Sequence, residues 1–280
     1  FNNSTAVFIG AYDATAGGRM NSIIDDVRIY NRALSAAEVQ NQYNQSQSKF
    51  NSSTSGSSIN KGLVGYWNFD GPNISGTRAK DSSGRENHGI LTGGPVAAIG
   101  KIGQALDFDG NNDYVDIGSD NIGLLFNGAT SVTMSAWFIA RDYVDGRIVQ
   151  ITNNSANLTA ASILTLSGTL TVGGRSGSGD SFQSKAFVSN PSLNVWHHIV
   201  GILNYSGDSI EIYLDGVSQG TTAVTFANNS YVHAGPTGLT DKIGGFFGVD
   251  AYWNGPIDDV RIYNRALSAS EVNKLYQMGR

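Results

Sequence analysis

Short runs of apolar residues, separated by Gly, Asn, Asp and Ser, dominate the sequence from about residue 60 onward. The segment Val132–Phe138 alternates between side chains of opposite character with a period of two, as a half-buried strand does. His198–Leu203 and Ile210–Leu214 are apolar runs joined by a polar connection, so we expect an antiparallel pair. Asp215-Gly216 then supplies the residues that a tight hairpin turn prefers.

Three further apolar runs extend this pattern: Leu63–Phe69, Ala105–Asp109 and Ile257–Tyr263. One helix is predicted after the last run, where Ser268 and Glu271 form a capping box. Short strands with frequent turn signals, and no alternation of strands with helices, favour an antiparallel sheet over a parallel one. The pattern therefore predicts an all-β antiparallel sandwich or jelly roll with a short C-terminal helix.

An internal repeat organises the chain. Residues 24–36 return without a change as residues 257–269. Residues 44–58 hold almost nothing apolar and are typical of a flexible linker. We therefore expect residues 1–43 to be the C-terminal part of a preceding copy, and residues 59–280 to be one complete domain. Such a fragment is cut from a longer parent chain, packs on its own domain, or docks on the sheet of a neighbouring molecule as a donated strand.

Composition narrows the class of protein. The chain has 280 residues, with 35 Gly, 12 Phe, 12 Tyr and 4 Trp, no Cys and a net charge of −5. Without Cys there is no disulfide and no thiolate metal site. An acidic chain lacks the basic surface that nucleic acid requires, so we expect no nucleic-acid partner. No apolar run is long enough to cross a membrane. A Gly-rich, aromatic-rich and charge-poor chain is typical of extracellular or cell-surface β proteins.

Five segments occur in an ordered series: Gly65–Asp70, Asp81–Gly89, Gly103–Gly110, Trp196–His198 and Ile257–Ser268. In this order and spacing they resemble the laminin-G-like branch of the concanavalin A-like lectin/glucanase superfamily. The resemblance implies a two-sheet jelly roll of the bacterial extracellular type, often repeated in large surface proteins. It implies no single ligand, because a fold does not determine a function.

Catalysis has little support in the sequence. A glycoside hydrolase needs two carboxylates on either side of the scissile bond. Of the four Glu residues, Glu38 and Glu271 are predicted helix caps and Glu86 lies in a turn. Glu211 and Asp215 could face the same side, but Asp215 belongs to the predicted hairpin turn. The four His are scattered and no Ser stands in a Gly-x-Ser-x-Gly motif. We therefore expect no enzyme.

A calcium site is predicted where the first and last strands meet. Asp70 ends the first strand and Asp258 begins the last, and the resemblance implies that these strands pair antiparallel. The following loop would add Asp81 and Asn87 at the same end. Carboxylate and carbonyl oxygens are the ligands that Ca2+ prefers, so we expect a structural Ca2+ on these side chains. The alternative is that Asp70 and Asp81 cap turns through backbone N–H groups, and that Asp258 pairs with Arg.

A sugar site is predicted in the loop before the last strand. Sugars stack on aromatic faces while polar groups hold their hydroxyls. The candidate residues are Phe246, Phe247, Asp250, Tyr252, Trp253 and Asn254, with Tyr143 from a second loop. Met20 matches Trp253 in the first copy, which favours a core position for that Trp. The alternative for the loop as a whole is that its aromatic residues close the edge of the sandwich.

These patterns together predict a non-catalytic carbohydrate-binding or adhesion module from a tandem-repeat bacterial surface or secreted protein. Its expected partners are a glycan or cell-surface polysaccharide and neighbouring copies of itself. A second hypothesis is a structural subunit or spacer of an extracellular fibre, assembled by strand complementation through residues 1–43. A third is a glycoside hydrolase whose acids the sequence does not reveal.

Overall fold

The computed structural model describes residues 27, 29, 30, 32–34, 58–119, 121–152, 159–233, 240–246 and 251–280. The chain divides into two units, Phe1–Thr54 and Ser55–Arg280. Almost all of the first unit lies outside the described residues. The predicted fragment of a preceding copy at 1–43 and its role in assembly therefore stay predictions. The fold below is that of the second unit.

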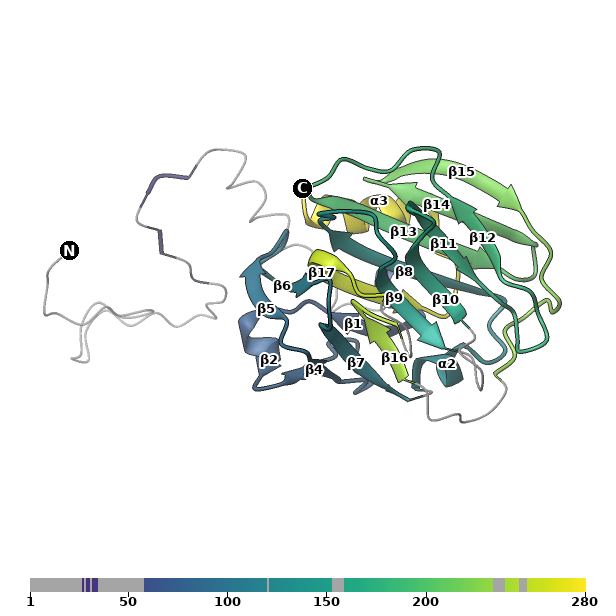
Figure 1. Cartoon of the computed structure of the whole chain (residues 1–280), viewed down its shortest axis with the longest axis horizontal. Coiled ribbons are helices and arrows are strands. Elements are labelled where there is room, and N and C mark those ends of the chain that lie inside the picture. Colours follow the sequence, from purple (N-terminus) through teal and green to yellow (C-terminus); the bar gives the residue numbers. More distant parts are fainter. Residues whose placement is uncertain are drawn as a thin grey trace, which may run out of the picture. The chain divides into compact units, whose positions relative to one another are not determined.

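Two antiparallel sheets form the second unit (Figure 1). Sheet A has eight strands in the order β15-β14-β13-β8-β17-β6-β5, with β1 also paired to β17. Its strands are β1 (Leu63–Trp67), β5 (Val96–Ile99), β6 (Gln104–Asp109), β8 (Ser131–Phe138), β13 (His197–Asn204), β14 (Ser209–Leu214), β15 (Val217–Ala223) and β17 (Asn254–Tyr263). The predicted antiparallel pairing of the first and last strands is confirmed.

Sheet B has nine strands in the order β12-β11-β10-β9-β16-β7-β4-β3-β2. Its strands are β2 (Ile74–Ser75), β3 (Arg78–Ala79), β4 (Gly89–Thr92), β7 (Tyr114–Ser119), β9 (Arg147–Thr152), β10 (Thr159–Leu166), β11 (Thr169–Gly174), β12 (Gln183–Ala186) and β16 (Thr240–Ile243). None of these strands was predicted individually.

The core lies between the two sheets. Fully buried aromatic side chains fill it, among them Trp67, Phe108, Phe138 and Trp253. Burying each such side chain contributes about 1.5–3 kcal/mol before the entropy cost of ordering it. The predicted all-β jelly-roll sandwich is confirmed.

A second apolar cluster covers the outer side of sheet A. Figure 1 shows helix α3 (Ala269–Met278) beside the strands of sheet A, and its Val272 and Leu275 share a buried apolar cluster with Val200 and Ile202 of β13. The predicted capping box is present at Ser268, because its side chain and that of Glu271 each accept a backbone N–H of the other residue. The remaining helices are α2 (Asn121–Phe126), η1 (Ser58–Asn60) and η2 (Gly71–Asn73).

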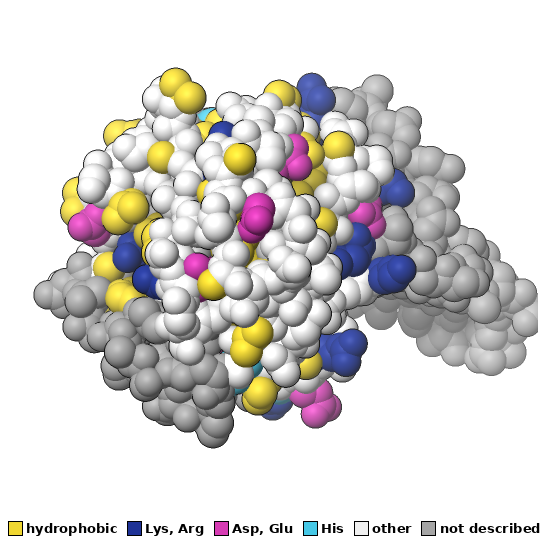
Figure 2. All heavy atoms as spheres, turned by 90° about the vertical axis from the view of Figure 1, so that its right-hand side faces the viewer, with side chains coloured by type: hydrophobic (Ala, Val, Ile, Leu, Met, Phe, Trp, Pro, Cys, Tyr) yellow, Lys and Arg dark blue, Asp and Glu magenta, His cyan; other side chains and the backbone are white. Residues whose placement is uncertain are grey.

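No helix in the described part of the chain is long and apolar enough to cross a membrane. The end of the sandwich near β15 and β12 faces the viewer in Figure 2, where hydrophobic side chains stand as separate spots among polar ones. Scattered exposed apolar residues of this kind are ordinary and do not indicate an interface. With α3 over sheet A, the outer side of sheet B is the face to examine for a site.

Candidate functional site

One row of side chains crosses the outer side of sheet B. The inward residues of its strands are fully buried in the core: Val115, Ile117, Val149, Ile151, Ile163, Val172 and Ile243. Because side chains alternate along a strand, their neighbours point outward. The strand register joins one outward residue from each strand into a row: Ser75, Arg78, Ile90, Asp116, Lys242, Gln150, Ser162, Gly173 and Ser184.

The row is buried in the middle, Ser184 at the β12 end is half-buried, and the exposed residues lie at the β2–β3 end. Gln150 and Ser162 have an exposed fraction of 0% and Lys242 of 6%. Arg78 and Ile90 are exposed, and Asp116 is half-buried. The accessible part of the row therefore lies over β2, β3, β4 and β7, and we call the outward side of these four strands the open face.

An aromatic pair borders the open face. Tyr114 of β7 stacks on Tyr252, with ring centroids 6.4 Å apart and 24° between the planes. The Nζ of Lys242 lies 3.6 Å from the centroid of the Tyr114 ring, a cation–π contact. A Cβ at Gly245 would lie 3.0 Å from Tyr114 Cβ and 3.2 Å from Tyr252 Cδ1, so glycine leaves room for both rings. Both tyrosines are half-buried.

The predicted sugar-binding loop contributes only part of this arrangement. Tyr252 belongs to the aromatic pair, and Phe246 is half-buried with the Arg147 guanidinium 5.1 Å from its ring centroid. Phe247 and Asp250 lie outside the described residues. Of the aromatic and acidic loop residues that the structure describes, Tyr252 is the one placed on the open face.

Trp253 is a core residue, and its assignment to a sugar site is wrong. Its side chain is 1% exposed and packs edge-on against Phe138, with centroids 5.6 Å apart and planes at 84°. The indole N–H donates to the Ile139 carbonyl over 3.2 Å. No ring face is left for a ligand, which agrees with the core position that the match to Met20 favoured.

Asn254 and Tyr143 support loops. Asn254 begins β17 and donates from its Nδ2 to Asp142. The Tyr143 hydroxyl donates to the Pro191 carbonyl over 2.9 Å, and burial raises the pKa of this phenol. Both side chains are half-buried and engaged with other loops, so we do not place them in the site.

An acidic hollow adjoins one end of the open face, at the edge of the sandwich where the chain passes between the two sheets after Thr92 and before Tyr114. It has a volume of about 290 Å³ and is lined by Gly93, Gly94, Val96, Asp107, Phe108, Asp109, Asp113 and Arg141. Arg141 donates from Nη1 to Asp107 Oδ1 over 2.7 Å and from Nη2 to Asp107 Oδ2 over 2.6 Å. Burial and the neighbouring Asp109 raise the pKa of Asp113, whereas the N–H of Asn111 lowers the pKa of Asp109. Such oxygens accept hydrogen bonds from hydroxyl groups.

Asp81 does not fit the predicted calcium site. Its Oδ1 accepts the N–H of Tyr66 and Ser83, at 2.9 and 2.8 Å. Its Oδ2 accepts the Ser83 hydroxyl at 2.7 Å and the N–H of Asn87 at 3.0 Å. The Asn87 side chain donates to the Val64 carbonyl. Both residues therefore fasten their loop to β1, which is the alternative that the sequence left open for Asp81.

Asp70 and Asp258 come together at a different loop. Asp258 Oδ2 accepts the N–H of Ile102 at 2.9 Å, and Asp70 Oδ1 accepts that of Gln104 at 2.9 Å. Asp258 is 0% exposed, and burial together with Asp259 raises its pKa to about 8. Its neighbour Asp259, and not Asp258, pairs with Arg261. Within the described residues no three His, Asp or Glu side chains are grouped to hold a metal.

Glu211 and Asp215, the acids that the sequence analysis considered and set aside as a catalytic pair, bind other groups in the structure. Glu211 Oε1 accepts the Ser218 hydroxyl at 3.0 Å. Asp215 lies in the hairpin turn with φ of 51°; it accepts the N–H of His198 and binds His197 Nδ1, each at 2.8 Å. His197 Nε2 lies 3.0 Å from the Ser192 hydroxyl. Ser192, His197 and Asp215 are therefore connected in series by hydrogen bonds, which the sequence analysis did not predict. This series ties β13 to the turn after β14.

Comparison with known structures finds the same fold in other proteins. Domain 4 of AbnA, an extracellular GH43 arabinanase from Geobacillus stearothermophilus solved with arabinotriose, matches with a TM-score of 0.58 and 20% identity, covering 76% of this chain and 98% of that one. The binding domain of Paraclostridial Mosquitocidal Protein 1 matches with a TM-score of 0.58 and 16% identity, covering 78% of this chain and 52% of that one.

Botulinum neurotoxin type C, whose cell entry depends on two ganglioside molecules, matches with a TM-score of 0.56 and 19% identity, covering 80% of this chain. The chain spans about half the length of the two toxin chains, 52% in each case. At these identities the likeness shows the fold alone. No curated protein matches the sequence.

A family profile settles the relationship. The profile of the Concanavalin A-like lectin/glucanases superfamily matches residues 109–273, more than half of the 280 residues. The matched segment runs from the end of β6 into α3 and so includes most of both sheets. The chain belongs to the concanavalin A-like lectin/glucanases superfamily.

Proposed function

We propose that this chain is a non-catalytic carbohydrate-binding module of an extracellular or cell-surface protein, and that it holds a glycan on the open face. The observation that carries the proposal is the stacked pair of Tyr114 and Tyr252. The pair stands beside the outward residues of β4 and β7, where Asp116 and Thr92 offer hydrogen-bonding groups. Half-buried tyrosines next to polar side chains suit the mixed apolar and polar surface of a sugar ring.

The arrangement also suits a chain longer than one sugar. Thr92 and Tyr114 pair across β4 and β7, and the acidic hollow begins at the next residues, Gly93 and Asp113. A polysaccharide that lies over the tyrosine pair and continues past Thr92 would approach this hollow, whose carboxylates accept hydroxyl hydrogens. The arabinotriose complex of the AbnA domain and the ganglioside dependence of the neurotoxin support a saccharide as the ligand class.

The acids of the open face favour binding over hydrolysis. Asp116 is the single carboxylate in the row described above, and its Oδ1 accepts the N–H of Gly118 at 2.9 Å. In the acidic hollow, Asp113 Oδ2 accepts the backbone N–H of Asp109 at 3.1 Å, and Arg141 donates to both oxygens of Asp107. These acids are therefore engaged in contacts within the protein.

Affinity gel electrophoresis with neutral polysaccharides, linear arabinan included, tests the proposal. We expect the wild-type protein to be retarded and Tyr252→Ala to bind about ten-fold more weakly, because loss of a stacked ring costs about 1 kcal/mol or more. Tyr252→Phe keeps the ring and should bind nearly as well as the wild type.

Tyr276→Ala is the matched control. Tyr276 is also a half-buried, stacked tyrosine, 5.6 Å from the Trp137 ring, but it lies on α3 over sheet A. Its loss should leave retardation unchanged once folding has been verified by circular dichroism. Absence of retardation by every polysaccharide, or equal weakening by Tyr252→Ala and Tyr276→Ala, contradicts the proposal.

A further inference from the structure

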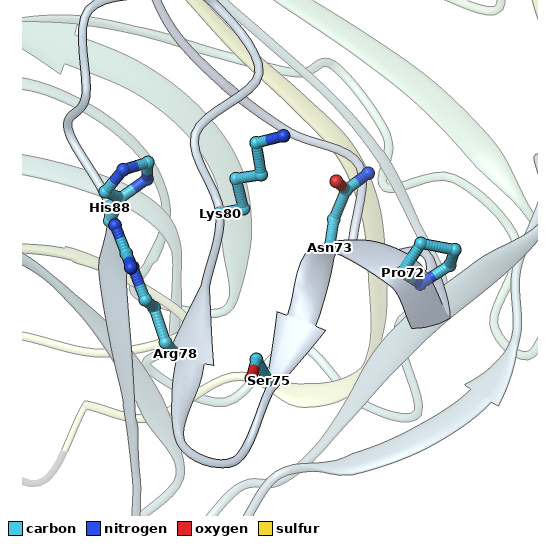
Figure 3. A pocket seen from close by; sticks show the side chains of 6 residues that line it. All are labelled: Pro72, Asn73, Ser75, Arg78, Lys80 and His88. Atoms are coloured by element: carbon cyan, nitrogen blue, oxygen red, sulfur yellow. The ribbon is translucent and has the colours of Figure 1, made fainter.

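A second hollow lies at the other end of the open face, beside the hairpin of β2 and β3 (Figure 3). Its volume is about 180 Å³, and its lining residues are Pro72, Asn73, Ser75, Arg78, Lys80 and His88. No carboxylate lines it. The two hollows at the ends of the open face therefore differ in charge, one acidic and one basic, on a chain whose net charge is −5.

Strand register explains why these residues converge. Ser75 of β2 pairs with Arg78 of β3, and the Lys80 N–H donates to the Asn73 carbonyl. Asn73 and Ser75 therefore lie opposite Lys80 and Arg78. Ala79 between Arg78 and Lys80 is 0% exposed and points inward, which directs both cations outward. His88 directly precedes β4, the next strand of the sheet. In Figure 3, Arg78 extends alongside His88, and Lys80 points toward Asn73.

The polar groups of the basic hollow are mainly donors. Arg78 and Lys80 are exposed, and in the described part of the chain neither forms an ion pair. His88 Nδ1 accepts the N–H of Asp81 at 3.0 Å, so the other ring nitrogen carries the proton of the neutral imidazole. Ser75 adds a hydroxyl. A guanidinium, an ammonium, an imidazole N–H and a hydroxyl around one small hollow match the oxygens of a single anionic group.

We propose that the basic hollow binds an anionic substituent, a sulfate ester or a carboxylate, of the polysaccharide that lies on the open face. This inference rests on the proposed function, since it assigns the charge of the glycan bound at the same face. Arg78 holds two oxygens of the anion through its planar fork, and Lys80 contributes a point charge. The acidic hollow repels anions at the opposite end, so the charged substituent is confined to the β2–β3 end.

Paired probes with one backbone and different charge test the inference. We would measure binding of dextran sulfate against neutral dextran, and of polygalacturonate against its methyl ester, by the wild type and by Arg78→Gln/Lys80→Gln. The wild type should bind at least one anionic probe about ten-fold more tightly than its neutral partner, and the double variant should lose that difference. The dextran pair tests a sulfate ester and the polygalacturonate pair tests a carboxylate.

Arg85→Gln/Lys274→Gln is the control for net charge. It removes the same number of positive charges from exposed positions outside the hollow. We expect it to retain the preference for the anionic probe. Equal loss in the two double variants, or no preference for either anionic probe in the wild type, overturns the inference.

The two proposals fail in distinguishable ways. If neutral arabinan binds and depends on Tyr252 while both anionic probes bind no better than their neutral partners, only the anionic substituent is refuted. If anionic probes bind through Arg78 and Lys80 but Tyr252→Ala changes nothing, the hollow is supported and the tyrosine platform is refuted. If no polysaccharide of any charge binds, both proposals are wrong.

Discussion

The buried carboxyl group of Asp258 makes the free energy of unfolding fall as the pH rises, whereas most carboxyl groups have the opposite effect. Its side chain is fully buried, and burial, Asp259 and Asp70 together raise its pKa to about 8. The unfolded chain has the ordinary value near 3.8. Between these two values the folded protein holds a proton that the unfolded chain releases. The free energy of unfolding therefore falls as pH rises through this window.

His198 acts in the opposite direction over part of the same window. Burial lowers its pKa to about 3 from 6.5, so below pH 6.5 the unfolded chain binds a proton that the folded protein does not. The two effects cancel between about pH 4 and 6.5, and Asp258 acts alone above that. A full difference of one bound proton changes the free energy of unfolding by about 1.4 kcal/mol per pH unit. Because Asp258 is half ionised at pH 8 and His198 offsets part of the change near pH 6.5, we expect a loss of about 1–1.5 kcal/mol from pH 6.5 to 8.

Urea denaturation at half-unit pH steps from 4.5 to 8.5 measures this loss, alongside the variant Asp258→Asn. Asn cannot ionise, so the variant should show no decline above pH 6.5. Below that value it should lose stability toward acid, because His198 then acts without compensation. Stability of the wild type that is constant or rises from pH 6.5 to 8 would refute the protonated state of Asp258.

Three further predictions follow from other contacts. Ser268→Ala removes the cap of α3 and should cost about 1 kcal/mol in urea denaturation, whereas Ser268→Thr should cost less; equal costs would show that the cap contributes nothing. Trp253→Ala should cost about 3–5 kcal/mol by creating a cavity, and a cost below 1 kcal/mol would show that the ring is not in the core. Because Asp81 already accepts four hydrogen bonds, a chelator should leave the melting temperature unchanged; a drop restored by Ca2+ would show that the metal binds after all.

The strands of sheet A were largely predictable from the sequence. β8, β13 and β14 were expected because buried residues give them clear apolar runs. β15 and β12 were not expected, since most of their side chains are exposed or half-buried and supply no apolar signal. The outward side chains of β9 and β10 include Gln150 and Ser162, which are polar but fully buried. Their polar character would predict that these side chains are exposed, which the structure does not show.

The candidate site was only partly predictable. Tyr252 was found because aromatic residues gather in its loop, but its partner Tyr114 lies more than a hundred residues away in the sequence. A signal for Tyr114 existed in the alternation of Tyr114 and Asp116 with apolar Val115 and Ile117. The hydrogen-bonded series of Ser192, His197 and Asp215 could not be predicted without the strand pairing. No spacing rule in the sequence relates residues of different hairpins.

The position of a bound glycan tests the central claim most directly. Side-chain NMR spectra of the protein, recorded as linear arabinan or a bound anionic probe is added, would report which residues the saccharide touches. If the glycan binds on the open face, the largest chemical-shift changes should occur at Tyr114, Tyr252 and Ile90. Shifts concentrated at Tyr276 and other residues over sheet A, with the open face unchanged, would contradict it.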